Sequence, residues 1–307
     1  MIDNEFQNKA QILVESYNAY ISESFNNIED KLIDKGQINE NDLMKKLSFK
    51  FMRGWQTQVL EPIEKTPKEY IKEINDKEEI LWLFDYFSKN SIDFNPEILM
   101  KKVYSLPDVL EELSKRLDAG IAGKDLSCPE EFDQDDNVQL NVISCSIVAF
   151  ENLPEEKKSE AAGILLEFMN SFHPNNDFLF ENVAKTLFNM GDEAHRKIVE
   201  AVNAADKITI KEEFLLNYLC DIEDSKKTDE IYYCLKNAFR KEGNKMLTGI
   251  FLGEYGDGRA IPVLRRYAMS NFGKVSDDEY YSIVAAIEKL GGIIDDLIPN
   301  RIPNMYQ

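Results

Sequence analysis

Histidine and cysteine, the side chains that most often bind metals or attack substrates, are scarce in this sequence. The two histidines, His173 and His195, stand beside neither a second metal ligand nor a nucleophile. The four cysteines are far apart, without a CxxC pair or a nearby histidine: Cys128, Cys145, Cys220 and Cys234. We therefore expect no metal site, no disulfide framework and no cofactor, and buried reduced thiols instead.

Basic residues are outnumbered. The chain has 36 Lys and Arg against 56 Asp and Glu, which gives a formal net charge of −20 at pH 7. Such a charge repels a phosphate backbone and disfavours nucleic acid as a partner. It favours a basic segment of another protein, attracted by the overall field of the chain.

One stretch, KKLSFKFMRGW at residues 45–55, is basic although the chain as a whole is acidic. Its basic and aromatic side chains are a candidate surface for nucleic acid: Lys45, Lys46, Lys50, Arg53 and Trp55. However, Leu47, Phe51 and Trp55 recur every four residues, which is typical of a helix that packs its apolar face into a core. We favour this core helix, with its lysines on the outside.

Long apolar runs are missing too. The longest uncharged run, Asn137–Phe150, has 14 residues and is too short to span a bilayer. The first residues, MIDNEFQNKAQ, lack the basic segment leading into an apolar one that marks a secretory signal. We expect a cytoplasmic protein with no membrane partner.

Alternating strand patterns are rare, and apolar residues recur at spacings of three and four through almost the whole chain, which predicts an all-α fold. We expect helices over residues 4–35 and 42–60, and a third that Asp76 and Glu79 open as a capping box. The predicted organisation has three parts: an N-terminal helical region at 1–120, an acidic loop at 121–137, and a repeat array at 138–307, continuous with the N-terminal helices.

The acidic loop partly matches a calcium-binding loop. Asp133, Asp135 and Asn137 occupy its first, third and fifth positions, but Val138 and Ser144 stand where the pattern needs glycine and glutamate. A solvated loop is therefore expected rather than a calcium site. The segment that follows, residues 137–150, fits either a strand or a helix, and its length favours a helix.

One local pattern recurs from the middle of the chain onward: an apolar residue, two of any kind, a second apolar residue, one more, and then an acid. Its four clearer copies begin 32, 33 and 38 residues apart: Leu187 to Asp192, Leu219 to Asp224, Leu252 to Asp257 and Leu290 to Asp295. Two weaker copies lie upstream, from Val103 to Asp108 and from Phe150 to Glu155. Each copy falls at a predicted junction between two helices, which indicates a repeated helical hairpin.

Each copy is interpreted as the corner of a two-helix unit. The first apolar residue ends the first helix, the second fills the corner, and the acid caps the second helix. Neither helix can bury its apolar stripe alone, so the units must stack. Gly253, Gly256 and Gly258 are then corner and backbone-conformation residues, because a phosphate-binding loop of the dinucleotide type follows a strand and reads GxGxxG.

The corner LGEYGDGRAIPVL, at residues 252–264, resembles the HEAT repeat. The similarity is greatest to the short repeats of phycobilisome-lyase-type HEAT proteins, whose corner reads LGxxGDxRAIPxL, and it covers roughly the last 170 residues. It implies a right-handed α-solenoid of stacked helical hairpins, a HEAT-like or armadillo-like superhelix. The second helices would line its concave side.

This resemblance implies a protein-interaction scaffold or adaptor rather than an enzyme. Counting eight and nine residues from the corner acids, and adding two nearby arginines, gives the candidate partner-binding residues: Tyr232, Tyr233, Arg265, Arg266, Arg259 and Arg196. An ordinary solvated helix face is the plainer interpretation. The alternative function is an enzyme on a HEAT-like scaffold, chromophore-lyase-like or alkylpurine DNA glycosylase-like, although no Ser/His/Asp or Cys/His grouping and no metal-ligand spacing is present in sequence.

Overall fold

The computed structural model describes residues 2–33, 54–92, 95–121, 134–172 and 174–298. Within these ranges the regular elements are all helices and no β-strand forms, which confirms the predicted all-α class. The first expected helix runs as α1 (Asn4–Ile33), whereas the second, at 42–60, lies mostly outside the described residues. No helix in the described part of the chain is both long and apolar enough to cross a bilayer.

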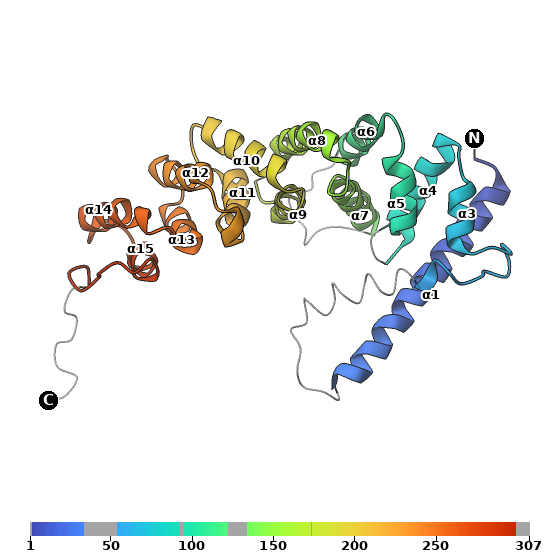
Figure 1. Cartoon of the computed structure of the whole chain (residues 1–307), viewed down its shortest axis with the longest axis horizontal. Coiled ribbons are helices and arrows are strands. Elements are labelled where there is room, and N and C mark those ends of the chain that lie inside the picture. Colours follow the sequence, from blue (N-terminus) through green and yellow to red (C-terminus); the bar gives the residue numbers. More distant parts are fainter. Residues whose placement is uncertain (1, 34–53, 93–94, 122–133, 173, 299–307) are drawn as a thin grey trace. The chain divides into compact units, whose positions relative to one another are not determined.

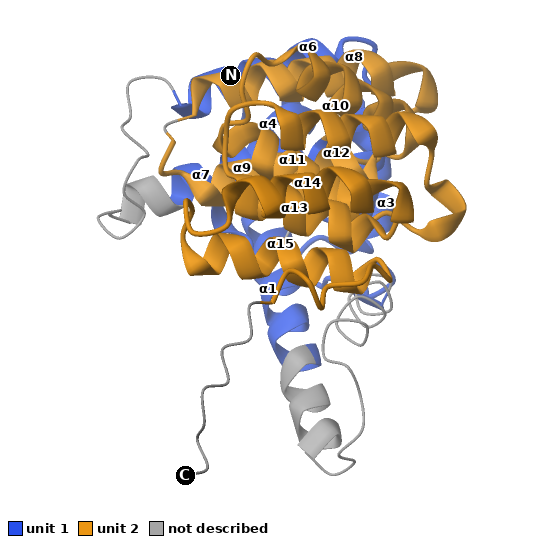
Figure 2. Cartoon of the chain, turned by 90° about the vertical axis from the view of Figure 1, so that its left-hand side faces the viewer, with its two compact units in different colours: residues 1–124, 129–149 blue, residues 125–128, 150–307 orange. Residues whose placement is uncertain are grey.

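The chain divides into two compact units (Figure 2). Unit 1 comprises Met1–Lys124 and Pro129–Ala149, and unit 2 comprises Asp125–Cys128 and Phe150–Gln307. The described helices of unit 1 are α1, α3 (Pro67–Glu73), α4 (Lys77–Asn90), α5 (Glu97–Tyr104), α6 (Val109–Ile121) and α7 (Gln134–Ala149).

Helix α7 confirms the helical interpretation of residues 137–150. It packs against α4 and α6, however, and so belongs to unit 1, whereas the sequence placed it at the start of the array at 138–307. Most of the acidic loop predicted at 121–137 lies outside the described residues, apart from Ile121 and the first turn of α7.

Aromatic side chains form part of the core of unit 1. Trp55 is fully buried, and its indole Nε1 donates to the hydroxyl oxygen of Ser16 at 3.0 Å. Its ring meets the rings of Tyr17 and Phe87 edge-on. This burial confirms the core interpretation of KKLSFKFMRGW at its tryptophan, while the basic residues of that stretch lie outside the described residues.

Unit 2 is built from paired helices (Figure 1). Its elements are α8 (Glu155–Phe168), η2 (Met169–Ser171), α9 (Asp177–Asn189), α10 (Asp192–Ala204), α11 (Ile210–Cys220), η3 (Asp224–Lys226), α12 (Asp229–Arg240), α13 (Lys245–Tyr255), η4 (Gly258–Ala260), α14 (Ile261–Asn271) and α15 (Asp277–Lys289). Helices α9, α11, α13 and α15 pack each on the next, and α8, α10 and α12 do the same in a second layer. The rings of Phe239 and Tyr267, 5.3 Å apart, join α12 to α14.

Apolar side chains fill the corners between paired helices, as predicted, at three of the four clearer copies. Met190, Ile222 and Tyr255 are all buried there. At the fourth copy the prediction is wrong, because Ile293 is 73% exposed. Residues 291–298 form turns and irregular structure instead of a second helix, so no helix among the described residues covers this side chain.

The predicted capping by acids holds at only some helix starts. Asp76 caps α4, where it accepts a hydrogen bond from a backbone N–H, and Asp257 does the same at η4. At the first clear corner Gly191 is the N-cap and the acid is already the first residue of α10. At the second, the N-cap of α12 is Thr228, because η3 separates the corner acid from the helix.

The glycines of GEYGDG have different structural roles. Gly256 ends α13 in the left-handed conformation, with φ of 81°, as expected at a helix corner. Gly253 lies inside α13, where an added Cβ atom would stand 2.9 Å from the Cβ atom of Ala286 in α15. Its missing side chain therefore lets two helices approach closely. The conformational role predicted for all three glycines is confirmed for Gly256 alone, since Gly253 and Gly258 have no positive φ.

Lysine side chains cover the carboxyl ends of helices in unit 2. Lys241 Nζ donates to the carbonyl oxygens of Val202, Asn203 and Ala205 at the end of α10, at 2.9, 2.8 and 2.5 Å. Lys211 reaches the end of α8 in the same way, 3.1 Å from a carbonyl oxygen. Because the last carbonyls of a helix have no partner inside it, these lysines stabilise the layer by pairing them.

Candidate binding surface

Helices α12 and α14 of unit 2 contact each other through the rings of Phe239 and Tyr267, and each exposes side chains along one side. In α12 the apolar stripe is buried, which directs Tyr233, Lys236 and Arg240 outward. In α14 the same periodicity exposes Arg266 and Met269. We call these five residues the α12–α14 face.

Arg259 connects the two helices at their amino-terminal ends. Its guanidinium pairs with the carboxylates of Asp229 and Asp257 at 2.7 and 2.6 Å. It also lies over the ring of Tyr232, 4.2 Å from the centroid, and 5.9 Å from the ring centroid of Tyr233. The two carboxylates therefore hold this cation in one place against the aromatic pair.

The two tyrosines of this pair have opposite environments. Tyr232 is 1% exposed, and its hydroxyl has no hydrogen-bond partner among the described residues. Tyr233 is 50% exposed. Successive helical residues are rotated by about 100°, so only one of two neighbours can face outward here. Of these two predicted contact residues, Tyr232 is therefore inaccessible to a partner, whereas Tyr233 is accessible.

The remaining predicted arginines do not form one cluster. Arg265 pairs with Asp296 at 2.6 Å, which holds its guanidinium to the segment after α15. Arg266 is exposed and forms no ion pair with any residue that the structure describes. Arg196 lies on α10 and pairs with Glu193. The structure therefore brings Arg259 and the tyrosines together and leaves Arg196 at a separate place.

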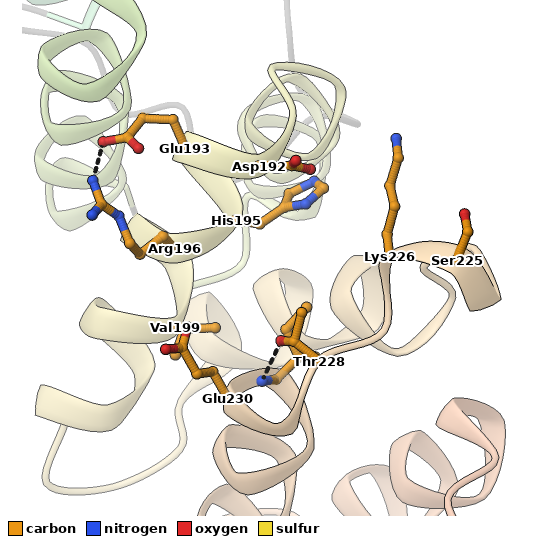
Figure 3. Close-up of a pocket in the computed structure, with 10 residues that line it drawn as sticks. Asp192, Glu193, His195, Arg196, Val199, Ser225, Lys226, Thr228 and Glu230 are labelled. Atoms are coloured by element: carbon orange, nitrogen blue, oxygen red, sulfur yellow. Dashed lines mark hydrogen bonds and ion pairs between the residues drawn. The ribbon is translucent and has the colours of Figure 1, made fainter.

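Arg196 lines an open groove of about 450 Å³ between α10 and the start of α12 (Figure 3). The groove is lined by Asp192, Glu193, His195, Arg196, Val199, Ser225, Lys226, Thr228, Glu230 and Ile231. Its lining contains both carboxylates (Asp192, Glu193 and Glu230) and cations (Arg196 and Lys226), so neither sign of charge dominates. This lining can hydrogen-bond a polar segment but offers no concentrated field for a charged ligand.

His195 lines the groove, and its environment indicates a structural role rather than a catalytic one. The side chain is buried, and its Nε2 atom lies 2.7 Å from the carbonyl oxygen of Phe188. Burial lowers the pKa of the imidazole, which makes a neutral ring donating from Nε2 the expected form at pH 7. The other histidine, His173, lies outside the described residues.

A second hollow, of about 410 Å³, lies at the GEYGDG corner. Asp257 Oδ1 there accepts from the backbone N–H of Arg259 at 2.9 Å, and Asp224 and Asp229 also line the hollow. A bound phosphate would need backbone N–H groups and would meet these carboxylates instead. The corner therefore fits a hinge better than a phosphate site.

The described cysteines are buried and form no disulfide with one another: Cys145, Cys220 and Cys234. Burial raises the pKa of Cys220 and of Cys234 to about 12, so both stay protonated at neutral pH. This confirms the expected buried thiols at these positions, while Cys128 lies outside the described residues. In the part of the chain that the structure describes, no three or more His, Cys, Asp or Glu side chains are grouped so that they could hold a metal ion.

Sequence reasoning missed three members of the α12–α14 face, namely Lys236, Arg240 and Met269. The signal for the first two was present, because they follow Tyr233 by three and seven residues and so share its side of a helix. The signal for Met269 was its spacing of three from Arg266.

Comparisons with known proteins give no family assignment. The chain matches no protein-family model, no curated protein and no solved structure. Function is therefore inferred from the residues of this chain.

Proposed function

We propose that this chain is a HEAT-like α-solenoid that acts as a protein-interaction scaffold and binds its partner on the α12–α14 face. The observation that carries the proposal is the stacking in unit 2, where α9, α11, α13 and α15 pack each on the next in one layer and α8, α10 and α12 do so in another. Stacks of this kind keep their second helices aligned and create an extended surface, which such proteins use to hold other proteins.

The composition of the face supports the proposal. Tyr, Met and Arg are enriched at protein interfaces, and the face contains Tyr233, Arg240, Arg266 and Met269. Tyr233 and Met269 are 50% and 56% exposed, so about half of each side chain is left free by the packing within unit 2 and is available for contact with a partner. Arg259 is already fixed by two carboxylates, so less side-chain entropy is lost when a partner binds beside it.

The state of the cysteine thiols indicates the cellular compartment in which the protein works. The three cysteines in the described residues are buried and form no disulfide with one another, although secreted proteins commonly use cysteine for that purpose. This supports the cytoplasm as the place where the scaffold works.

Site-directed photocrosslinking tests the proposal. A benzoylphenylalanine would replace Tyr233 in one variant and Met269 in another. The control would carry it at Phe178, which is 48% exposed on α9, in the other helix layer. Each variant would be irradiated in lysate, and crosslinked proteins would be identified by mass spectrometry.

We expect the same protein crosslinked at Tyr233 and at Met269 and absent from the Phe178 control. Crosslinks only at Phe178, or none at any position, would refute the proposed surface. Tyr232 is unsuitable for this purpose, because its substitution would disturb the packing of α12.

A further inference from the structure

We propose that the α12–α14 face binds an acidic segment of its partner, one that carries an apolar or aromatic residue among its carboxylates; this inference rests on the proposed function. Residues 231–240 and 258–271 contain no Asp or Glu. They contain five cations: Lys236, Arg240, Arg259, Arg265 and Arg266. In a chain with a net charge of −20, this is a concentration of the opposite sign.

These cations are gathered on neighbouring helices. The Phe239–Tyr267 ring contact joins α12 to α14 toward their carboxyl ends, and Arg259 reaches from η4 to the start of α12. One contact near each end therefore links the two helices. The cations of the α12–α14 face thus stand on two helices that contact each other.

The cations divide into neutralised and available ones. Arg259 and Arg265 already pair with carboxylates of the chain. Lys236, Arg240 and Arg266 form no ion pair with any residue that the structure describes. On α10, by contrast, the exposed cations pair with glutamates of the same helix. In this helix layer, the cations without an ion pair among the described residues therefore lie on α12 and α14 rather than on α10.

Local charge decides what binds at contact distance. The overall negative charge favours a basic partner at long range, which was the expectation from the sequence. At physiological salt, however, exposed charges more than about 8 Å apart are largely screened. A segment bound to the α12–α14 face is therefore attracted mainly by the three available cations of that face, which favour carboxylates.

Two features favour an acidic peptide over nucleic acid. Tyr233 and Met269 flank the cations and offer apolar contact to a side chain between two carboxylates. A nucleic acid carries a phosphate charge about every 1.7 Å of duplex. Three cations cannot neutralise such a strand, and the rest of the chain repels it.

Peptide binding measured by fluorescence anisotropy tests the inference. The probe is a fluorescein-labelled peptide in which glutamates alternate with leucine and phenylalanine. Two matched peptides replace glutamate by glutamine or by lysine, and a labelled oligonucleotide is the fourth probe. The variant carries Lys236→Glu, Arg240→Glu and Arg266→Glu. The control carries Lys68→Glu, Lys89→Glu and Lys185→Glu, which are exposed elsewhere and change the net charge equally.

We expect the glutamate peptide to bind the unmodified chain and the control alike, and to bind the variant about tenfold more weakly. Equal binding of the lysine peptide, equal weakening in the control, or tighter binding of the oligonucleotide would each overturn the inference. A partner that crosslinks at Tyr233 with equal yield in the charge-reversed variant would also overturn it, while leaving the scaffold proposal intact. Absence of any crosslink refutes the scaffold proposal itself.

Discussion

Replacing Gly253 with alanine tests the close packing of α13 on α15. The new methyl carbon would stand 2.9 Å from the Cβ atom and 3.1 Å from the Cα atom of Ala286. Because one of these atoms belongs to the backbone, the two helices must move apart. We expect this overpacking to cost about 1–3 kcal/mol. Alanine returns about 1 kcal/mol through its higher helix propensity, so the net expectation is a loss of about 1 kcal/mol.

Gly163→Ala is the matched control. Gly163 lies in α8 of the same unit, and a Cβ atom added there would meet nothing within 4 Å. Only the propensity gain remains, so this variant should be more stable by up to about 1 kcal/mol.

Urea unfolding followed by far-ultraviolet circular dichroism gives both values. The two midpoints should move in opposite directions from that of the unmodified chain. Hydrogen exchange should also be faster in α13 and α15 of the Gly253 variant and unchanged there in the control. Midpoints that rise together by the same amount would refute the close contact between α13 and α15.

Two further predictions concern polar groups of unit 2. Lys241→Met removes the ammonium that three carbonyl oxygens share but keeps the methylene chain, so it should destabilise by about 2 kcal/mol. Lys185→Met, on an exposed face, should change stability by less than about 0.5 kcal/mol; equal melting shifts would contradict the capping role. Because burial lowers the pKa of His195 from its ordinary 6.5, the unfolded chain binds this proton more tightly, and stability present above pH 6.5 is lost as the pH falls below it. His195→Gln should lose less unfolding free energy over that interval, and parallel curves of stability against pH would argue against a buried neutral imidazole.

Helix periodicity was sufficient to predict the all-α class and many of the buried positions. The burial of Met190 and Tyr255 at the corners follows from spacing along the chain, which local backbone geometry fixes. Ile293 matches the same spacing yet is exposed, because burial also needs a covering helix and none follows it in the described residues. The spacing of residues within one corner does not predict whether a covering helix follows it.

The exposed residues of the α12–α14 face were predicted less well because helix starts vary. Positions were counted from the corner acids, but α12 and α14 begin five and four residues after theirs, while α10 begins at its own. Counting from the helix starts instead aligns Glu200 with Asn237 and Met269, all of them exposed. The miscount selected Tyr232, which faces inward.

The fixed position of Arg259 could not be predicted at all. One of its two carboxylate partners, Asp229, lies 30 residues earlier in the chain and on another helix. Only the packing of α12 beside η4 brings the two side chains together. Such contacts depend on how units stack, and sequence spacing carries no information about them.

The lysines at the helix ends have a consequence for the order of events during synthesis. Lys211 follows its acceptor in α8 by 45 residues, and Lys241 follows its acceptors at the end of α10 by 36 to 39. The end of each helix is therefore translated well before the lysine that closes it. Water must hydrate those carbonyls in the interval. We expect the nascent chain to acquire the full stability of each hairpin about one repeat behind the point of elongation.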